Sequence, residues 1–199
     1  MDKFFARDDL PVLVQAAIAH AQFENIHPFA DGNGRRGRAL IQVILRTKGM
    51  LRNTKAPILA GPLRNTKSYF RALTSYREGD AAPIITAFAD ASWFAAQSGM
   101  ELIDRLAKLV DEARENLSGF RSDANVWKVV PLLISHPALT APALAQLTGL
   151  TPQSAVRTLG QLADAGVLVD RTGQRRNRVW IHEGILQVLD QYAEQLRRR

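Results

Sequence analysis

Apolar residues recur at helical spacing through the first 117 positions of this 199-residue chain. Between residues 11 and 26 they repeat every three to four positions, and Pro28 follows the pattern, so a helix is predicted there. The same spacing predicts helices over residues 35–48 and 66–77, and one or two long helices over residues 83–117. A short apolar segment lies at residues 57–60. We therefore expect this part of the chain to be mostly helical.

The pattern changes after residue 121. The predicted elements are helices over residues 126–135, 141–147 and 151–165, strands over residues 167–170 and 178–181, and a closing amphipathic helix over residues 185–196. Thr151 is a good N-cap, and Pro152 suits the first helical position. Three helices followed by a two-stranded hairpin is the order of a winged helix-turn-helix domain. Ser118 and Gly119 form a small break, so we predict a mostly α chain with domains over residues 1–118 and 119–199.

The composition is that of an ordinary globular protein, with 46% hydrophobic and 23% charged residues. The absence of cysteine excludes a disulfide scaffold and cysteine-ligated zinc, and it favours a reducing compartment. No apolar run approaches the roughly 18 residues of a membrane span, and the N-terminus lacks the form of a signal peptide. We therefore expect a cytoplasmic protein without a membrane partner.

The formal net charge is +7, and residues 120–199 carry more than half of this excess. Basic surfaces attract nucleic acids and phosphate-rich ligands. In a winged helix, residues 151–165 would form the recognition helix, and the predicted outward-facing residues are Gln153, Ser154, Arg157 and Thr158. The predicted wing carries Arg171, Arg175, Arg176 and Arg178. DNA is therefore one expected partner, while a homodimer or a docked protein is the alternative, because such domains also serve as association modules.

Residues 27–38 combine several groups that suit phosphate chemistry. Gly32 and Gly34 flank Asn33 just before a predicted helix, so successive backbone N–H groups can turn toward one point at a helix N-terminus. Arg35 and Arg38 lie one turn apart on the same helix face, where both guanidinium groups can reach an anion. The sequence therefore predicts an anion site.

Two further side chains complete this group. Asp31 lies at the mouth of the loop, and a carboxylate beside bound phosphates is the usual ligand of Mg²⁺. His27 ends the preceding helix, and an imidazole can act as a general base at neutral pH. Each feature alone is commonplace, since Gly-Asn-Gly is most often a turn and paired arginines usually face solvent. Their coincidence within twelve residues favours transfer of a nucleotide phosphate to a hydroxyl.

The segment His-Pro-Phe-Ala-Asp-Gly-Asn-Gly-Arg-Arg-Gly-Arg resembles the signature of the Fic family, His-Pro-Phe-x-Asp/Glu-Gly-Asn-Gly-Arg-x-x-Arg, at every defined position. Residues 19–24 also resemble the helix before that signature, and the resemblance extends over roughly residues 8–117. It implies a Fic-type helical bundle that acts as a protein adenylyltransferase. Such an enzyme transfers AMP from ATP, with Mg²⁺, to a Ser, Thr or Tyr hydroxyl of a target protein or of the chain itself.

The resemblance also implies roles for individual residues. His27 would deprotonate the target hydroxyl, and Asp31 would bind Mg²⁺. Residues 32–34 would hold the α- and β-phosphates of ATP, and Arg35 and Arg38 the β/γ end. Relatives that transfer phosphate replace the first glycines of the loop, so the Gly-Asn-Gly here favours nucleotide transfer.

Three more residues are assigned by resemblance. Phe29 would anchor the loop in the core. Asn65 and Tyr69 resemble a family segment that borders the adenine, although core packing of Tyr69 is an equal alternative. Residues 74–79 match the family's inhibitory pattern, which we interpret as chance because they end a core helix.

Family members usually carry a longer segment before the motif, with a β-hairpin flap that clamps the target. Only 26 residues precede His27 here, without a hairpin signal, so we expect an N-terminally shortened chain that binds nucleotide but docks its target poorly. The alternative function is a winged-helix DNA-binding regulator whose Fic part is a remnant or a nucleotide sensor. A gene fragment without independent activity is the third interpretation.

Overall fold

The computed structural model describes residues 2–52, 66–173 and 178–197. The chain divides into two compact units, one of residues 1–99 with 194–199 and one of residues 100–193. The division falls within two helices, α6 (Ala82–Asn116) and α9 (Glu183–Arg197). None of the described helices is long and apolar enough to cross a membrane.

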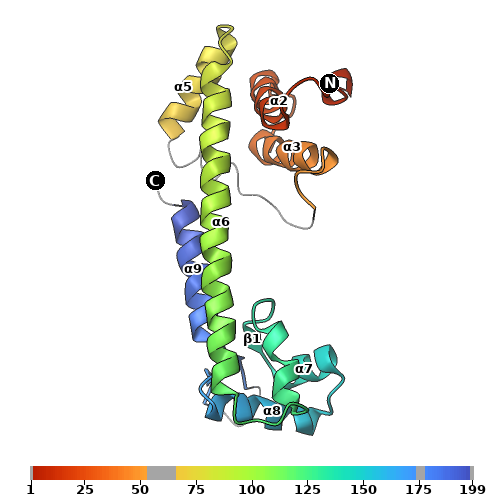
Figure 1. Cartoon of the computed structure of the whole chain (residues 1–199). Coiled ribbons are helices and arrows are strands. Elements are labelled where there is room, and N and C mark those ends of the chain that lie inside the picture. The colour runs from red at the N-terminus through yellow and green to blue at the C-terminus, as the bar shows by residue number, and fades with distance from the viewer. Residues whose placement is uncertain (1, 53–65, 174–177, 198–199) are drawn as a thin grey trace. The chain divides into compact units, whose positions relative to one another are not determined.

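The N-terminal unit is helical throughout its described part (Figure 1). Besides the first part of α6 and the end of α9, its elements are α1 (Asp2–Phe5), α2 (Val12–Ile26), α3 (Asn33–Thr47) and α5 (Thr66–Arg77). The predicted helices are confirmed, although α3 begins two residues earlier than expected and α6 is one continuous helix. The apolar segment at residues 57–60 lies outside the described residues.

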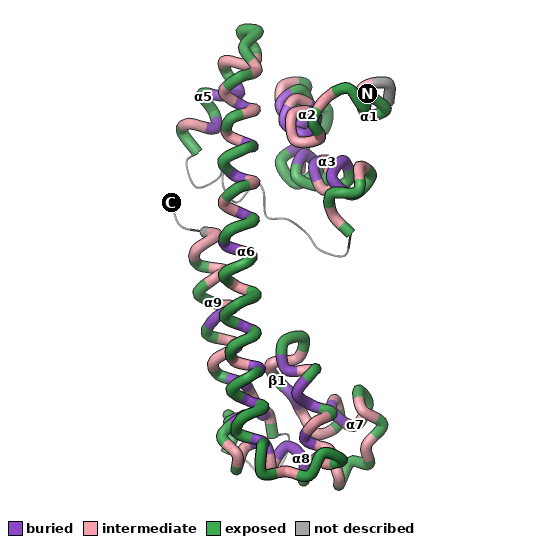
Figure 2. The backbone as a smooth tube through the Cα atoms, viewed as in Figure 1, coloured by how far each residue is buried: buried purple, intermediate pink, exposed green. Residues whose placement is uncertain are grey.

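Small side chains on α2 allow the helices of this unit to approach closely. Ala17 and Ala21 are fully buried, and they share a core with Ile41 and Leu45 of α3 and Phe88 of α6. The buried positions form stripes on the helices in Figure 2. Burial of these apolar faces is the main force that holds α2 and α3 together. The loop between the two helices is therefore held at both ends by packed elements.

The C-terminal unit combines helices with a small antiparallel sheet. After the second part of α6 its elements are η1 (Asn125–Lys128), η2 (Val130–Leu132), β1 (Ala138–Leu139), α7 (Ala141–Thr148), α8 (Pro152–Asp164), β2 (Val169–Asp170), β3 (Trp180–Ile181) and the first part of α9, as far as Ala193. The strand order is β1-β3-β2, with Trp180 of β3 opposite Leu139 on one side and Asp170 on the other. The two predicted strands are present but shorter, and β1 was not predicted.

The predicted helix over residues 126–135 is wrong. The chain forms the two 3₁₀ turns η1 and η2 instead. Pro131 explains the difference, because it has no N–H for a bond to the carbonyl of Trp127 and its ring clashes with that carbonyl in an α-helix. Val126 and Val130 are nevertheless buried, so the segment still contributes its apolar side to the core.

A glycine at the end of α7 and a threonine at the start of α8 define the turn between the two helices. Gly149, with a φ of 71°, ends α7 in the left-handed conformation that favours glycine. Thr151 then caps α8, since its Oγ1 accepts a hydrogen bond from the Ser154 N–H at 3.2 Å. Pro152 follows at the first helical position, as predicted from the sequence.

Loss of this cap gives a first test. Thr151→Ala is expected to lower the free energy of unfolding of the C-terminal unit by about 1 kcal/mol, because the Ser154 N–H loses its partner. Urea unfolding followed by tryptophan fluorescence measures the change. Thr148→Ala is the matched control, since that hydroxyl donates within α7 to the Leu144 carbonyl and caps no helix. Equal losses in both variants would contradict the capping role.

Candidate functional site

His27 ends α2 in a left-handed conformation. Its φ is 51° and its ψ 54°, and its N–H donates to the Phe23 carbonyl at 3.0 Å. It has the only positive φ of any non-glycine residue that the structure describes. A non-glycine residue in this region costs roughly 1–2 kcal/mol, and such strain is concentrated at functional sites. The turn leaves the imidazole at the surface, with 63% of the side chain exposed.

Asn33 holds the loop in shape. Its side chain is buried, and its Oδ1 accepts a hydrogen bond from the Phe29 N–H at 3.0 Å. Its Nδ2 donates to the Phe29 carbonyl at 2.5 Å. This pair of bonds fixes the loop against the start of α3. Asn33 was expected to help hold the phosphates, and its side-chain bonds within the loop were not predicted, because a buried asparagine with this role has no periodic signal in the sequence.

Gly32 and Gly34 open the start of α3 to a ligand. Gly32 occupies the N-cap position with a φ of 78°, and no side chain caps α3 in the described structure. The first turn of α3 also holds no acidic residue. Its N–H groups and the positive end of the helix dipole are therefore available to an anion.

The structure brings Arg35 and Arg38 to this helix start. A Cβ on Gly32 would lie 3.4 Å from the Arg35 Nη2, and a Cβ on Gly34 would lie 3.6 Å from the Arg38 Nη1. Both arginines are exposed at the surface. Two guanidinium groups thus border the glycines, an arrangement suited to binding several phosphate oxygens.

Asp31 lies beside the same group of residues. Its Oδ1 accepts a hydrogen bond from the Gly32 N–H at 2.6 Å, and its Oδ2 lies 3.6 Å from the Arg35 Nη2. The side chain is 94% exposed. No cluster of three or more potential protein ligands occurs among the described residues. One exposed carboxylate still fits Mg²⁺, which commonly binds one or two carboxylates together with substrate phosphates.

The prediction that Phe29 anchors the loop in the core is wrong. The residue is 42% exposed. One face is covered by the guanidinium of Arg36, whose Cζ lies 3.7 Å from the ring centroid. Arg36 also donates from Nη1 to the Asp31 carbonyl at 3.3 Å. The Phe29 ring therefore packs between Arg36 and the ring of the buried Phe23, whose centroid is 6.2 Å away, and the sequence did not predict a role for Arg36.

A buried polar pair joins α2 to α5. His20 is 2% exposed, and its Nε2 lies 2.7 Å from the hydroxyl of Tyr69 on α5. Burial lowers the pKa of His20 to about 4 and raises the pKa of Tyr69 above its usual value. Tyr69 thus packs in the core, while its role beside an adenine stays a prediction. Asn65 lies outside the described residues.

The residues expected to contact DNA are only partly exposed. Gln153 and Arg157 are exposed and Ser154 is half-buried, but Thr158 is buried and donates to the Ser154 carbonyl at 2.8 Å. The outward orientation predicted for Thr158 is therefore wrong. In the wing, Arg171 lies 3.8 Å from Glu183 and Arg178 lies 3.3 Å from Asp170. Arg175 and Arg176 lie outside the described residues.

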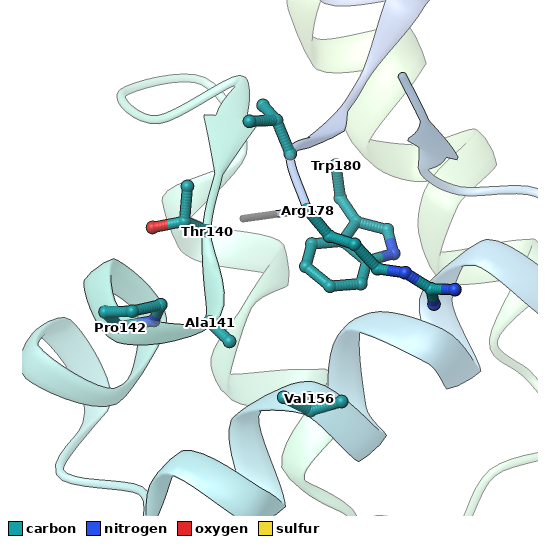
Figure 3. Close-up of a pocket in the computed structure, with 7 residues that line it drawn as sticks. Thr140, Ala141, Pro142, Val156, Arg178 and Trp180 are labelled. Atoms are coloured by element: carbon teal, nitrogen blue, oxygen red, sulfur yellow. The ribbon is translucent and has the colours of Figure 1, made fainter. Parts of the chain in front are cut away.

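A cavity of about 480 Å³ opens between α7, α8 and β3. Figure 3 shows Val156 and Trp180 among its mostly apolar lining. The complete lining is Thr140, Ala141, Pro142, Val156, Arg178, Val179 and Trp180. This part of the surface therefore offers a single guanidinium beside apolar walls.

The N-terminal segment is similar to a known protein family. Residues 1–45 match the model of the Fic/DOC family. The matched segment contains α2, the loop with its polar residues, and most of α3. Its match agrees with the signature read from the sequence.

Distant relatives carry the same family name. "Protein adenylyltransferase Fic" of Drosophila sechellia is 31% identical over 114 residues, which make up 54% of this chain and 22% of the relative. The protein of that name from Drosophila melanogaster gives the same values. The one from Drosophila virilis is 36% identical over 75 residues, 38% of this chain and 14% of the relative. The chain thus spans about a fifth or less of the length of these curated Fic relatives.

Proposed function

We propose that this chain transfers AMP from ATP to a hydroxyl of a protein target, or of the chain itself, in a reaction that depends on Mg²⁺. The observation that carries the proposal is the grouping of Asp31, Arg35 and Arg38 at the uncapped start of α3, with His27 at the end of the preceding helix, within the segment that matches the Fic/DOC family. Such chemistry needs positioning and charge stabilisation above all.

The chain's own groups would bind the phosphates, neutralise charge and accept a proton in this reaction. Backbone N–H groups of residues 32–34 bind the phosphates, and Arg35 and Arg38 neutralise the charge on the departing pyrophosphate. His27 accepts the proton of the target hydroxyl as its oxygen forms a bond to the α-phosphorus. The bond between the α-phosphorus and the oxygen that bridges it to the β-phosphate breaks, and pyrophosphate leaves. Mg²⁺, held by Asp31 and phosphate oxygens, would supply further charge neutralisation.

Labelled nucleotides test this proposal. The protein is incubated with Mg²⁺ and ATP that carries ³²P at either the α- or the γ-phosphate, and label on precipitated protein is counted. We expect label from the α-position alone, and its loss with EDTA. Parallel reactions with GTP, CTP and UTP determine the base preference. Label from the γ-position would indicate phosphate transfer instead. No label, together with no calorimetric binding of Mg-ATP, would refute nucleotide chemistry altogether.

We further propose that the C-terminal unit is a winged helix-turn-helix domain. The order of η1, β1, α7, α8, β2 and β3 supports it, as does the three-stranded antiparallel sheet. The exposed Gln153 and Arg157 on α8 favour DNA as a partner, while the ion pairs of Arg171 and Arg178 weigh against it. A DNA affinity that falls steeply with salt supports the DNA interpretation. No binding at low salt leaves association between proteins.

A further inference from the structure

Glu24 occupies the last turn of α2, three residues before His27. Its side chain is only 13% exposed, whereas glutamate side chains usually lie exposed at the surface. The carboxylate lies against α3, because a Cβ on Gly37 would come within 2.5 Å of the Glu24 Oε1. The absence of a side chain on Gly37 therefore creates the space that Glu24 occupies.

Both oxygen-bearing groups of Glu24 face the imidazole of His27. The His27 Nδ1 lies 3.2 Å from the Glu24 carbonyl oxygen and 4.0 Å from the carboxylate Oε2. A carbonyl can only accept a hydrogen bond, so this contact requires the proton of the neutral ring on Nδ1. The other nitrogen, Nε2, then carries the lone pair that a general base needs.

On the basis of the function proposed above, we propose that Glu24 is a positioning residue, which orients the imidazole of His27. Its carbonyl and carboxylate together hold the imidazole as the Nδ1–H tautomer, and the carboxylate stabilises the positive ring that forms when Nε2 takes the proton of the target hydroxyl. The low exposure of Glu24 reduces the screening of this interaction by water. Gly37 supports the arrangement indirectly, because a larger residue would displace the carboxylate.

Nitrogen NMR tests the tautomer without any substrate. Long-range ¹H–¹⁵N spectra of ¹⁵N-histidine-labelled protein are recorded at a pH where the ring is neutral, and the His27 signals are assigned as those lost in His27→Ala. The proton is expected on Nδ1 in the wild type. Glu24→Gln removes the charge at constant size, and Gly37→Ala moves the carboxylate. Both are expected to raise the share of the Nε2–H form.

Matched controls separate this effect from general damage. Glu78→Gln removes an exposed carboxylate of the same unit, and Gly99→Ala adds a methyl group where nothing lies within 4 Å. Neither is expected to change the His27 tautomer. If Gly37→Ala fails to fold, Glu24→Asp takes its place as the variant that moves the carboxylate, because it keeps the charge on a shorter side chain. A wild-type proton on Nε2, or a ratio unchanged in Glu24→Gln, overturns the proposal.

Kinetics provide the second readout. Glu24→Gln is expected to lower kcat for transfer from α-labelled ATP by about tenfold, with the KM for ATP unchanged, since the carboxylate acts on the ring and not on the nucleotide. A raised KM with unchanged kcat contradicts the positioning role. If the wild type transfers no nucleotide, the proposed function fails while the NMR result still decides whether Glu24 sets the tautomer.

Discussion

His27→Ala is expected to slow AMP transfer by about 10²- to 10⁴-fold, the usual contribution of a general base. The imidazole is 63% exposed at the end of α2, and its Nε2 is the nitrogen not engaged with Glu24. Without it, the target hydroxyl must lose its proton to water. Binding of Mg-ATP is expected to persist, because the phosphate-binding groups begin at Gly32. Initial rates with α-labelled ATP and calorimetric titration of Mg-ATP measure the two quantities.

His136→Ala is the control for this experiment, since that residue lies in the C-terminal unit and its Nδ1 bonds to the Ser135 hydroxyl at 2.9 Å. It is expected to leave both quantities unchanged. A wild-type rate in His27→Ala would contradict the role as base. A simultaneous loss of Mg-ATP binding would show that the residue supports the loop rather than the chemistry.

Acidification is expected to lower the free energy of unfolding of the N-terminal unit by roughly 3 kcal/mol between pH 6.5 and pH 4. Burial lowers the pKa of His20 in the folded protein to about 4, while the unfolded chain titrates near the ordinary value of 6.5. Over this interval the unfolded state binds a proton that the folded state does not. The stability is therefore complete above pH 6.5 and is lost progressively as the pH falls toward 4.

Hydrogen exchange of peptides from α2 and α5 at a series of pH values measures this loss in the N-terminal unit alone. The distinction matters because burial also lowers the pKa of His182 in the other unit, where its Nδ1 accepts a hydrogen bond from the Ile185 N–H at 3.2 Å. His20→Gln is expected to be less stable at neutral pH and less sensitive to acid. A wild-type stability that stays constant from pH 6.5 to 4 would contradict a buried neutral histidine.

Local patterns predicted most elements, and the errors have identifiable physical causes. Apolar spacing identified α2, α5 and α6, and the cap signals at Thr151 and Pro152 identified the start of α8. The two-residue strand β1 was missed because its pairing with Trp180 and Ile181 is distant in sequence. Thr158 was predicted to face outward because it is polar. It lies instead on the buried face of α8, where its hydroxyl donates a hydrogen bond to the preceding turn.

The sequence predicted which residues make up the candidate site better than it predicted how they contact one another. The motif supplied His27, Asp31 and the two arginines, because their types and spacing are characteristic. The contacts that shape the loop depend on side-chain directions that no linear pattern encodes. These are the bonds of Asn33 to Phe29, the stacking of Arg36 on the Phe29 ring, and the approach of Glu24 to His27.

The bonds of Asn33 and Arg36 to the loop have a consequence for protein engineering. Within residues 2–52, 66–173 and 178–197, the loop's hydrogen bonds and ring contacts described above come from α2, α3 or the loop itself. Residues 12–47 therefore form a nearly self-contained cassette whose conformation is encoded by contiguous sequence. Such a cassette can be grafted onto another helical scaffold that buries the same alanine-rich face, and its local backbone should survive the transfer.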